Sequence, residues 1–323
     1  MKDGSDPSEL LELLRRYLER RYGIQIVAMD RLDRRIYRAS LKVGPSWVVR
    51  AFSARREAER VQGDADLLNF LESQGFPAER CARPDAVTNP RGRGVLVTKF
   101  VEGKKPECSP GTLRSLGELL GRLNTLPADS GAPAREAGAL HVYTPNEGLP
   151  RRDLASAGAW LDGAQERVPS QNRGPLESLR AQLSRADDCG DLPRALIHPD
   201  PVMKNVIESE GQMILVDWTG AGRGPRVLPL ALLIWSCALL GDGRWSPERV
   251  DPIVEGYSSK IRLERDEVQR LGSAMKVRPL VFACWRYSHA TKVGKIPDGT
   301  EWWWPNDELA DSIAGRTMSL LRT

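Results

Sequence analysis

The chain has 323 residues, of which 41% are hydrophobic and 28% are charged, and its formal net charge at pH 7 is +4. This length and composition are ordinary for a soluble globular protein with one large domain or two lobes. The small net charge does not indicate a nucleic-acid partner. The longest apolar run, over 228–240, is too short and interrupted to place the protein in a membrane.

The cysteines and the N-terminus indicate a cytoplasmic protein. The cysteines are odd in number, form no C-x-x-C pair and stand at positions 81, 108, 189, 237 and 284. This pattern fits reduced thiols in a cytosol better than a disulfide framework or a zinc site. The first residues include no apolar region of the kind that a signal peptide carries.

The first third of the chain predicts a helix followed by antiparallel strands. Pro7 suits the first turn of a helix whose apolar stripe extends from Leu10 to Leu18. Alternating apolar residues predict strands over 24–32, 36–43, 47–52 and 94–98. A helix is expected over 55–74, before the last of these strands.

The remainder of the chain is expected to be mostly helical. A helix begins after Ser109, and a loop rich in glycine, alanine and proline spans 128–150, where His141 is expected to pack within the loop. Further helices are predicted over 153–167, 175–187, 227–240, from 246, and over 263–290, where Pro279 should kink or break the helix.

The segment 195–225 departs from this helical pattern. It predicts a strand, a loop, a short strand, a turn at Glu210-Gly211, a second strand that ends at Asp217, and a glycine-rich loop. Polar residues interrupt the apolar strands at His198, Asp200 and Asn205. Asn205 follows Asp200 by five positions, and Asp217 follows Asn205 by twelve.

This spacing is typical of a phosphoryl-transfer loop. An Asp just past a strand can accept the proton of an attacking hydroxyl, and an Asn and a second Asp can hold Mg²⁺ on the phosphates of a nucleotide. The pattern H-x-D-x-x-x-x-N followed by a strand-terminal Asp is the kinase catalytic set. The alternative interpretation is a polar hairpin whose Asp and Asn side chains cap turns.

The segment resembles the aminoglycoside phosphotransferase and choline kinase superfamily, whose usual form is HGD, then N, then IDW or IDF, then a G-x-G-P loop. The matching residues here are His198-Pro199-Asp200, Asn205, Val216-Asp217-Trp218 and Gly222-Arg223-Gly224-Pro225. The resemblance implies an α+β, two-lobed protein-kinase-like fold with a small antiparallel-sheet N-lobe over 1–103 and a larger, mostly helical C-lobe over 104–323. It also implies a small-molecule kinase that uses ATP or GTP.

The resemblance assigns a role to each polar residue of the segment. Asp200 is the catalytic base, and His198 holds the catalytic loop. Asn205 and Asp217 bind Mg²⁺. Lys204 is either a contact of the γ-phosphate or a solvated side chain.

The nucleotide site implied by the resemblance involves the N-lobe. Arg50 stands where a kinase places its phosphate-binding lysine, and a guanidinium can grip phosphate oxygens bidentately; it is equally interpreted as a solvated strand residue. Its acidic partner is expected to be Asp64, with Glu57 and Glu59 as rivals. Lys99 and Val101 belong to the expected hinge, whose backbone binds the purine.

Two departures from the superfamily pattern favour a second hypothesis, a nucleotide-binding pseudokinase with a regulatory or scaffold role. The loop 30–35 between the first two strands contains no glycine. Pro229 replaces the Asp that usually braces the catalytic loop. The intact set of Asp200, Asn205 and Asp217 argues for an active enzyme.

The C-terminal region offers candidate residues for the acceptor. Acidic and aromatic side chains gather over 298–311, and the acceptor-binding candidates are Asp298, Glu301, Trp303 and Asp307. Acids beside aromatic faces suit a cationic ligand, so the predicted acceptor is an aminoglycoside or a related antibiotic, with antibiotic resistance as the biological role. The alternative is a terminal helix whose tryptophans pack on the lobe. A monomer or a homodimer is expected.

Overall fold

The computed structural model describes the chain except for residues 1–6, 54–57, 128–133, 139–148, 241–242 and 322–323. The chain divides into two compact units. The first, here called the sheet unit, consists mainly of residues 1–104 together with 207–217. The second, the helical unit, consists mainly of 105–130, 134–206 and 218–323.

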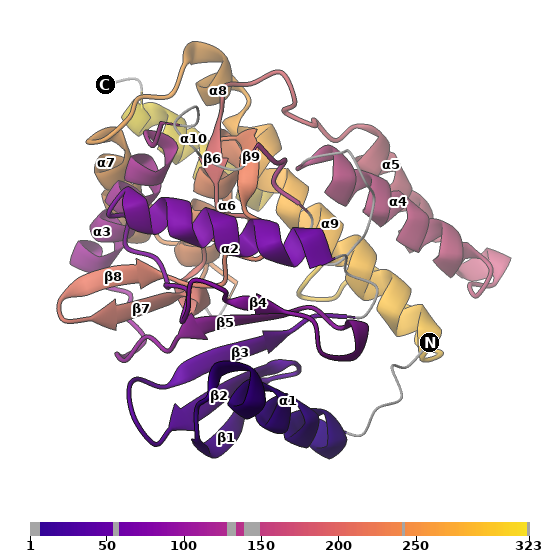
Figure 1. The fold of residues 1–323 in the computed structure, drawn as a ribbon. Coiled ribbons are helices and arrows are strands. Elements are labelled where there is room, and N and C mark those ends of the chain that lie inside the picture. The colour runs from indigo at the N-terminus through magenta and orange to yellow at the C-terminus, as the bar shows by residue number, and fades with distance from the viewer. Residues whose placement is uncertain (1–6, 54–57, 128–133, 139–148, 241–242, 322–323) are drawn as a thin grey trace. The chain divides into compact units, whose positions relative to one another are not determined.

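The described residues of the sheet unit form a five-stranded antiparallel sheet (Figure 1). In spatial order its strands are β1 (Ile26–Asp33), β2 (Ile36–Leu41), β3 (Trp47–Ala51), β5 (Val95–Lys99) and β4 (Val87–Thr88). The loop that was expected over 30–35 is shorter in the structure than predicted. Asp33 pairs with Ile36, so the strands continue to a two-residue turn.

Alternation of side chains explains how the sheet gains its buried face. Ala39, Val49 and Val97 come from three neighbouring strands, and all are fully buried. The helices of this unit are α1 (Pro7–Tyr22) and α2 (Ala58–Ser73). α1 packs on β1, and α2 packs on β4 and β5, so that Leu14, Leu18 and Leu71 are also fully buried.

A hairpin from the middle of the sequence completes the sheet unit. Strands β7 (Val206–Ser209) and β8 (Gln212–Leu215) pair across Glu210-Gly211. Both turn residues have positive φ, 51° and 76°, as the twist of a tight two-residue hairpin requires. The backbone N–H of Lys104 donates to the carbonyl of Glu208, and the carbonyl of Lys104 accepts from the backbone N–H of Glu208. This pair of hydrogen bonds ties the hairpin to the end of the first segment.

The helical unit contains a set of helices and one short strand pair. The helices are α3 (Pro110–Asn124), α4 (Arg151–Gln165), α5 (Gly174–Ser184), α6 (Val227–Ala238), α7 (Pro247–Ser258), α8 (Arg265–Gln269), α9 (Leu271–Lys292) and α10 (Asp307–Leu321). The strands are β6 (Arg194–Ile197) and β9 (Gly222–Pro225). Figure 1 shows α4 and α5 beside α9, and buried residues of these three helices form one apolar cluster that includes Leu161, Leu179 and Leu280.

The structure corrects two expectations in this unit. The long helical stretch over 263–290 is interrupted near Arg270, and α9 continues without a break through Pro279. The expected glycine-rich loop at 222–225 is strand β9, which pairs with β6. A Cβ on Gly222 would lie 2.7 Å from the backbone nitrogen of Ala137, so glycine is needed there because another strand-like segment approaches closely.

Some expectations fall on residues that the structure does not describe. Glu57, His141 and most of the loop over 128–150 lie outside the described residues. Within the described part of the chain, every helix is too short or too polar to cross a membrane.

Candidate active site

The predicted catalytic loop lies in the helical unit and follows β6 directly. His198 is fully buried, and its Nδ1 accepts a hydrogen bond of 3.1 Å from the backbone N–H of Asp200. The imidazole ring also meets the indole of Trp218 edge-on, with ring centroids 4.8 Å apart. These contacts tie His198 to the loop and to Trp218; the expected role of His198 in holding the catalytic loop stays a prediction.

Asp200 is nearly buried and makes polar contacts within its own loop. The Nδ2 of Asn205 donates to the backbone carbonyl of Asp200 at 2.8 Å and to its Oδ2 at 3.1 Å. The ammonium of Lys204 lies 3.0 Å from the same Oδ2. Because the amide nitrogen of Asn205 faces Asp200, its amide oxygen is the atom that remains suited to a metal ion.

The second carboxylate oxygen of Asp200 faces a residue that sequence reasoning missed. Nη2 of Arg278, on α9, lies 3.7 Å from Oδ1 of Asp200, and Nη1 lies 3.5 Å from Oδ2 of Asp153 on α4. Burial raises the pKa of Asp153, and the guanidinium groups of Arg278 and Arg152 only partly offset this effect. Arg278 lies 78 residues after Asp200 and belongs to no local motif, so no sequence pattern pointed to this contact.

Arg278 also explains how the loop is supported although Pro229 replaces the usual acid. Pro229, His198 and Arg278 line the same small cavity in the helical unit, together with Asp153. Besides Lys204 of its own loop, Asp200 therefore has an ionic contact to Arg278 of α9.

The sheet unit carries the other group of candidate residues. The guanidinium of Arg50, on β3, lies 3.4 Å from Oδ1 of Asp217 and 3.7 Å from Oε1 of Glu79. The side chain of Arg50 is 11% exposed and that of Glu79 is 3% exposed. Arg50 is thus a buried, paired cation rather than a solvated strand residue.

Glu79, which sequence reasoning also missed, joins several parts of this cluster. Its Oε1 accepts from the backbone N–H of Asp217 at 2.8 Å, and its Oε2 accepts from the hydroxyl of Thr98 at 2.9 Å. Asp217 has a φ of 66°, a conformation that costs little for Asp and more for most other residues. Glu79 therefore helps to hold Asp217 in this uncommon conformation.

The charges around Arg50 favour its protonated form. Burial, the largest single influence, lowers the pKa of Arg50, but the carboxylates of Glu79, Asp217 and Asp64 together raise it above the ordinary value. Asp64, on α2, is 1% exposed. Its rival Glu59 is exposed at the start of the same helix. Asp64 thus favours the charged form of Arg50 together with Glu79 and Asp217, which form ion pairs with it.

The contacts of the expected hinge residues indicate a function less clearly than those of Arg50 and Glu79. Lys99 ends β5 with an exposed side chain, and its backbone N–H donates to the carbonyl of Arg80. Val101 follows it and is half-buried. The roles of both residues in binding the purine stay predictions.

The two predicted metal ligands each offer a donor atom of the kind that Mg²⁺ uses in proteins. Among the described residues there is no cluster of three or more His, Cys, Asp or Glu side chains that could enclose a metal ion. Mg²⁺ keeps several waters and is typically bound by one or two carboxylates with substrate phosphates. The 39% exposed carboxylate of Asp217 and the amide oxygen of Asn205 are donors of this kind.

The acceptor candidates near the C-terminus have local partners. Oδ1 of Asp298 accepts from the backbone and hydroxyl of Thr300, and the carboxylate of Glu301 accepts from the backbone N–H groups of Asp298 and Gly299. Trp303 packs beside Trp304 against the apolar cluster of α4, α5 and α9. These contacts are closer to those expected if the tryptophans pack on the lobe than to those of an exposed cation-binding site. The acceptor role of these residues stays a prediction.

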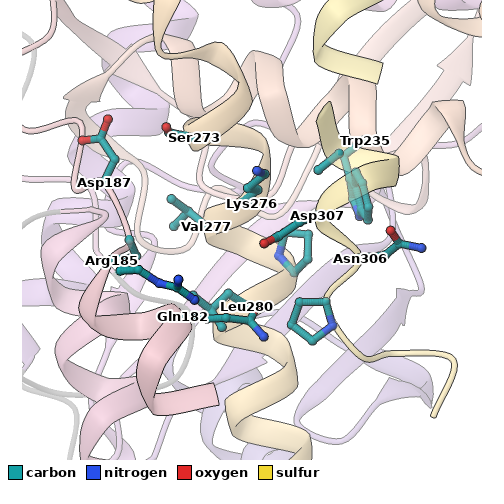
Figure 2. Close-up of a pocket in the computed structure, with 14 residues that line it drawn as sticks. Gln182, Arg185, Asp187, Trp235, Ser273, Lys276, Val277, Leu280, Asn306 and Asp307 are labelled. Carbon is teal, nitrogen blue, oxygen red and sulfur yellow. The ribbon is translucent and has the colours of Figure 1, made fainter. Parts of the chain in front are cut away.

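Asp307 lies at a pocket of about 240 Å³ in the helical unit (Figure 2). Figure 2 shows Asp307 and Asn306 together with Trp235 of α6, Lys276 of α9 and Arg185, which follows α5. Lys276 pairs with Asp311. Acids and bases are both present at this pocket, so its charge does not select a cationic ligand.

Comparison with known proteins agrees with this architecture. The model of the phosphotransferase enzyme family matches residues 23–269. No curated protein matches the chain. Among solved structures, amicoumacin kinase hAmiN in complex with AMP-PNP, Ca²⁺ and Ami is 13% identical, with a TM-score of 0.60 over 98% of this chain and 96% of that chain.

Two other solved structures show the same fold. An aminoglycoside-3′-phosphotransferase of type VIII is 20% identical, with a TM-score of 0.59 over 85% of this chain and 98% of that chain. Choline kinase LicA from Streptococcus pneumoniae is 12% identical, with a TM-score of 0.58 over 97% of this chain and 99% of that chain.

The antiparallel sheet unit, the helical unit and the H-x-D-x-x-x-x-N loop define a protein-kinase-like phosphotransferase that acts on hydroxyl groups. Because the family model covers most of its length, the chain belongs to the phosphotransferase enzyme family. The expected recognition, fold class and enzyme class are therefore confirmed.

Proposed function

We propose that this enzyme transfers the γ-phosphoryl group of ATP to a hydroxyl group of a small molecule. The observation that supports this most directly is the environment of Asp200. Its carboxylate is held by Asn205 and Lys204 at the end of β6, and its loop is fixed by the buried His198. A positioned carboxylate of this kind is what an alcohol acceptor requires as a general base.

In the proposed reaction Asp200 accepts the proton of the acceptor hydroxyl. The bond between that oxygen and the γ-phosphorus forms as the bond from the γ-phosphorus to the β–γ bridging oxygen breaks, and ADP leaves. Lys204 neutralises charge beside the base, and Arg50 steadies the α- and β-phosphates. The enzyme contributes mainly positioning and charge neutralisation, because phosphoryl transfer needs little other chemistry from the protein.

We propose Asn205 and Asp217 as the oxygen ligands of Mg²⁺. When bound, the metal neutralises charge on the nucleotide phosphates. The contribution of the protein is to present the amide oxygen of Asn205, whose nitrogen is engaged by Asp200, and the carboxylate of Asp217, whose backbone is held by Glu79. The guanidinium of Arg50 also pairs with the carboxylate of Asp217.

The acceptor belongs to the range that the names of the similar structures span, which includes aminoglycosides, choline, macrolides and amicoumacin. The first test is ATP consumption by the purified protein with one compound from each class. Asp200→Asn should lower kcat by about 10²–10⁴-fold, since it removes the general base, and should leave the affinity for Mg²⁺·AMP-PNP nearly unchanged. Full turnover by Asp200→Asn on a true substrate would show that the base is assigned wrongly.

The metal proposal needs a separate variant. Asp217→Asn keeps a side chain that tolerates positive φ but weakens the affinity for divalent cations. We expect nucleotide binding by Asp217→Asn to lose its dependence on Mg²⁺ in isothermal titration calorimetry. Nucleotide binding in the wild type without turnover on any hydroxyl compound would instead favour the pseudokinase hypothesis.

A further inference from the structure

Arg38 crosses one face of the sheet to reach the expected hinge. It lies on β2 directly opposite Val48 of β3, and β3 separates β2 from β5 (Figure 1). β2 and β5 are therefore about 10 Å apart. The guanidinium carbon of Arg38 nevertheless lies 4.0 Å from the ring centroid of Phe100, the residue that follows β5. The side chain of Arg38 must therefore extend across β3, in front of Val48.

The crossing takes place on the face of the sheet that carries Arg50. Val48 and Arg50 are two positions apart in β3, so their side chains point to the same side. Arg38 shares that side, because directly opposite residues of an antiparallel pair do. The hinge follows Lys99, which pairs with Trp47 at the start of β3. A ligand that extends from Arg50 toward the hinge therefore meets the guanidinium of Arg38 about 7 Å along β3.

Contacts within the sheet unit hold this guanidinium but leave one of its faces. Nη2 of Arg38 donates to Oε1 of Glu102 at 2.6 Å, and the ring of Phe100 lies against the guanidinium plane. A guanidinium is planar and has two faces. Phe100 takes one face and Glu102 takes an edge, while the side chain of Arg38 remains 34% exposed. The second face can therefore receive a flat ligand, and its orientation is set before the ligand binds.

The backbone beside this guanidinium indicates what kind of ligand fits. Among the described residues, no hydrogen bond engages the backbone N–H or carbonyl of Val101. Val101 is half-buried, and backbone polar groups in such positions need a partner. A flat ring with donor and acceptor atoms on its edge can pair with Val101 while its face lies on Arg38. A nucleobase has both features, whereas an alkyl chain or a saturated sugar lacks the flat face.

We propose that the base of the nucleotide stacks on Arg38, and that Phe100 and Glu102 hold the guanidinium for this contact. This inference rests on the proposed kinase function, because it places the base end of the nucleotide whose phosphates Arg50 contacts. A guanidinium attracts the face of an aromatic ring, and the attraction is stronger where water is excluded. Arg38 therefore contributes to the affinity for the base and not to the affinity for the phosphates.

The test separates the base of the nucleotide from its phosphates. Isothermal titration calorimetry with Mg²⁺ present measures the Kd of AMP-PNP and the Kd of inorganic tripolyphosphate, which has no base. Arg38→Ala removes the guanidinium, and Arg38→Lys keeps the charge without the planar face. Arg20→Ala removes an exposed arginine from α1 of the same unit and is the matched control for the change in charge. Thermal unfolding of each variant shows whether the fold is retained.

We expect Arg38→Ala to raise the Kd of AMP-PNP by about 3- to 30-fold, the range of one cation–π contact. The Kd of tripolyphosphate should change by less than about twofold, since salt screens the lost charge. Arg38→Lys should lie between Arg38→Ala and the wild type. Glu102→Gln removes the ion pair but keeps the stacking group, so its effect should be smaller, about 2- to 3-fold. Arg20→Ala should change neither Kd.

The wild type also offers a direct readout. Nε of Arg38 is buried, and its N–H resonance can be followed in protein labelled with ¹⁵N-arginine and assigned with Arg38→Lys. The ring current of a stacked base should move this resonance upfield when AMP-PNP binds. Tripolyphosphate should not produce this shift. If tripolyphosphate binds too weakly for calorimetry, the resonance decides, and no upfield shift with AMP-PNP overturns the inference.

Two calorimetric results would also overturn it. An unchanged or lower Kd of AMP-PNP in Arg38→Ala would mean that the side chain is idle or obstructs the base. Equal losses for AMP-PNP and tripolyphosphate would mean that it acts on the phosphates.

The inference and the proposed function can fail separately. If Arg38→Ala selectively weakens AMP-PNP but the wild type phosphorylates no alcohol, the stacking contact stands and the proposed function fails. If the wild type phosphorylates an alcohol and Arg38→Ala binds AMP-PNP as tightly as the wild type, the function stands and the stacking contact fails. A wild type that does not bind AMP-PNP would overturn both.

Discussion

The backbone N–H of Asp217 donates a 2.8 Å hydrogen bond to Oε1 of Glu79, 138 residues away in sequence. The same carboxylate group accepts from Thr98 and faces the guanidinium of Arg50. Glu79 is 3% exposed, so it cannot exchange these partners for water without cost. A residue with no motif of its own thereby supports both the predicted metal ligand and the predicted phosphate contact.

Removing Glu79 should weaken Mg²⁺·nucleotide binding. A hydrogen bond to a charged group contributes about 1.5–3 kcal/mol, so Glu79→Ala should raise the Kd for Mg²⁺·AMP-PNP on the order of tenfold or more. Glu79→Gln retains an oxygen that can accept from Asp217 and should have a smaller effect. Calorimetric titration measures both, with Glu72→Gln, an exposed acid that faces Arg80, as the control. Equal affinities of Glu79→Ala and wild type would contradict this role.

Arg50 should matter to the stability of the fold as well as to nucleotide binding. Arg50→Met leaves the carboxylates of Glu79 and Asp217 without their cation, and loss of one partner of a buried ion pair typically costs about 3–5 kcal/mol. Arg50→Lys keeps the charge but not the planar fork, so it should be more stable than Arg50→Met and still bind nucleotide weakly. Urea unfolding followed by circular dichroism checks the order. An Arg50→Met variant as stable as wild type would exclude a structural role for the pair.

Cys108 should be the cysteine that reacts in the folded protein. It is exposed, whereas Cys81, Cys189, Cys237 and Cys284 are buried, and burial raises the pKa of each of those four thiols to about 12. Mass spectrometry after brief treatment with iodoacetamide at pH 8 should find one modified site, and Cys108→Ser should remove it. Labelling of a second cysteine without denaturant would contradict the burial pattern.

The same thiols predict a dependence of stability on alkaline pH. Because their pKa values are raised in the folded state, the folded state binds these protons more tightly than the unfolded state does. Their contribution is complete below the ordinary thiol pKa and is lost as the pH rises toward about 12. Cys284→Ala should make the fall in urea midpoint between pH 8 and pH 10 shallower; an unchanged slope would show that this thiol does not contribute.

A pair of glycine variants tests the packing of the helical unit. A Cβ on Gly256 of α7 would lie 2.1 Å from the carbonyl oxygen of Arg114 on α3, whereas a Cβ on Gly315 of α10 would meet nothing within 4 Å. Gly256→Ala should therefore force α3 and α7 apart and lower the thermal midpoint. Gly315→Ala should raise stability by about 0.5–1 kcal/mol, because alanine favours helix. Similar midpoints for the two variants would show that α3 and α7 do not depend on this contact.

Much of the architecture could be predicted from the sequence because local patterns determine it. Alternating residues predicted the strands of the sheet unit, and the Glu210-Gly211 turn predicted the β7–β8 hairpin. The spacing of His198, Asp200 and Asn205 predicted a catalytic loop because these residues lie close together in sequence. Hydrogen bonds join Asp200 to both His198 and Asn205. Boundaries were less predictable: α9 continues through Pro279, since packing on α4, α5 and α6 supports a helix that local propensity would break.

Only the tertiary structure decided which distant residues serve these loops. Glu79 and Arg278 lie far in sequence from the groups they contact and belong to no motif, so their roles arise from the path of the backbone. The residues predicted to bind the acceptor show the same limit of prediction from sequence. Composition drew attention to the acids at 298–311, but backbone N–H groups of their own loop bind the carboxylates of Asp298 and Glu301. A sequence motif identifies functional residues that lie close together in the chain. Burial and charge pairing also involve residues that are distant in sequence and meet only in the folded structure.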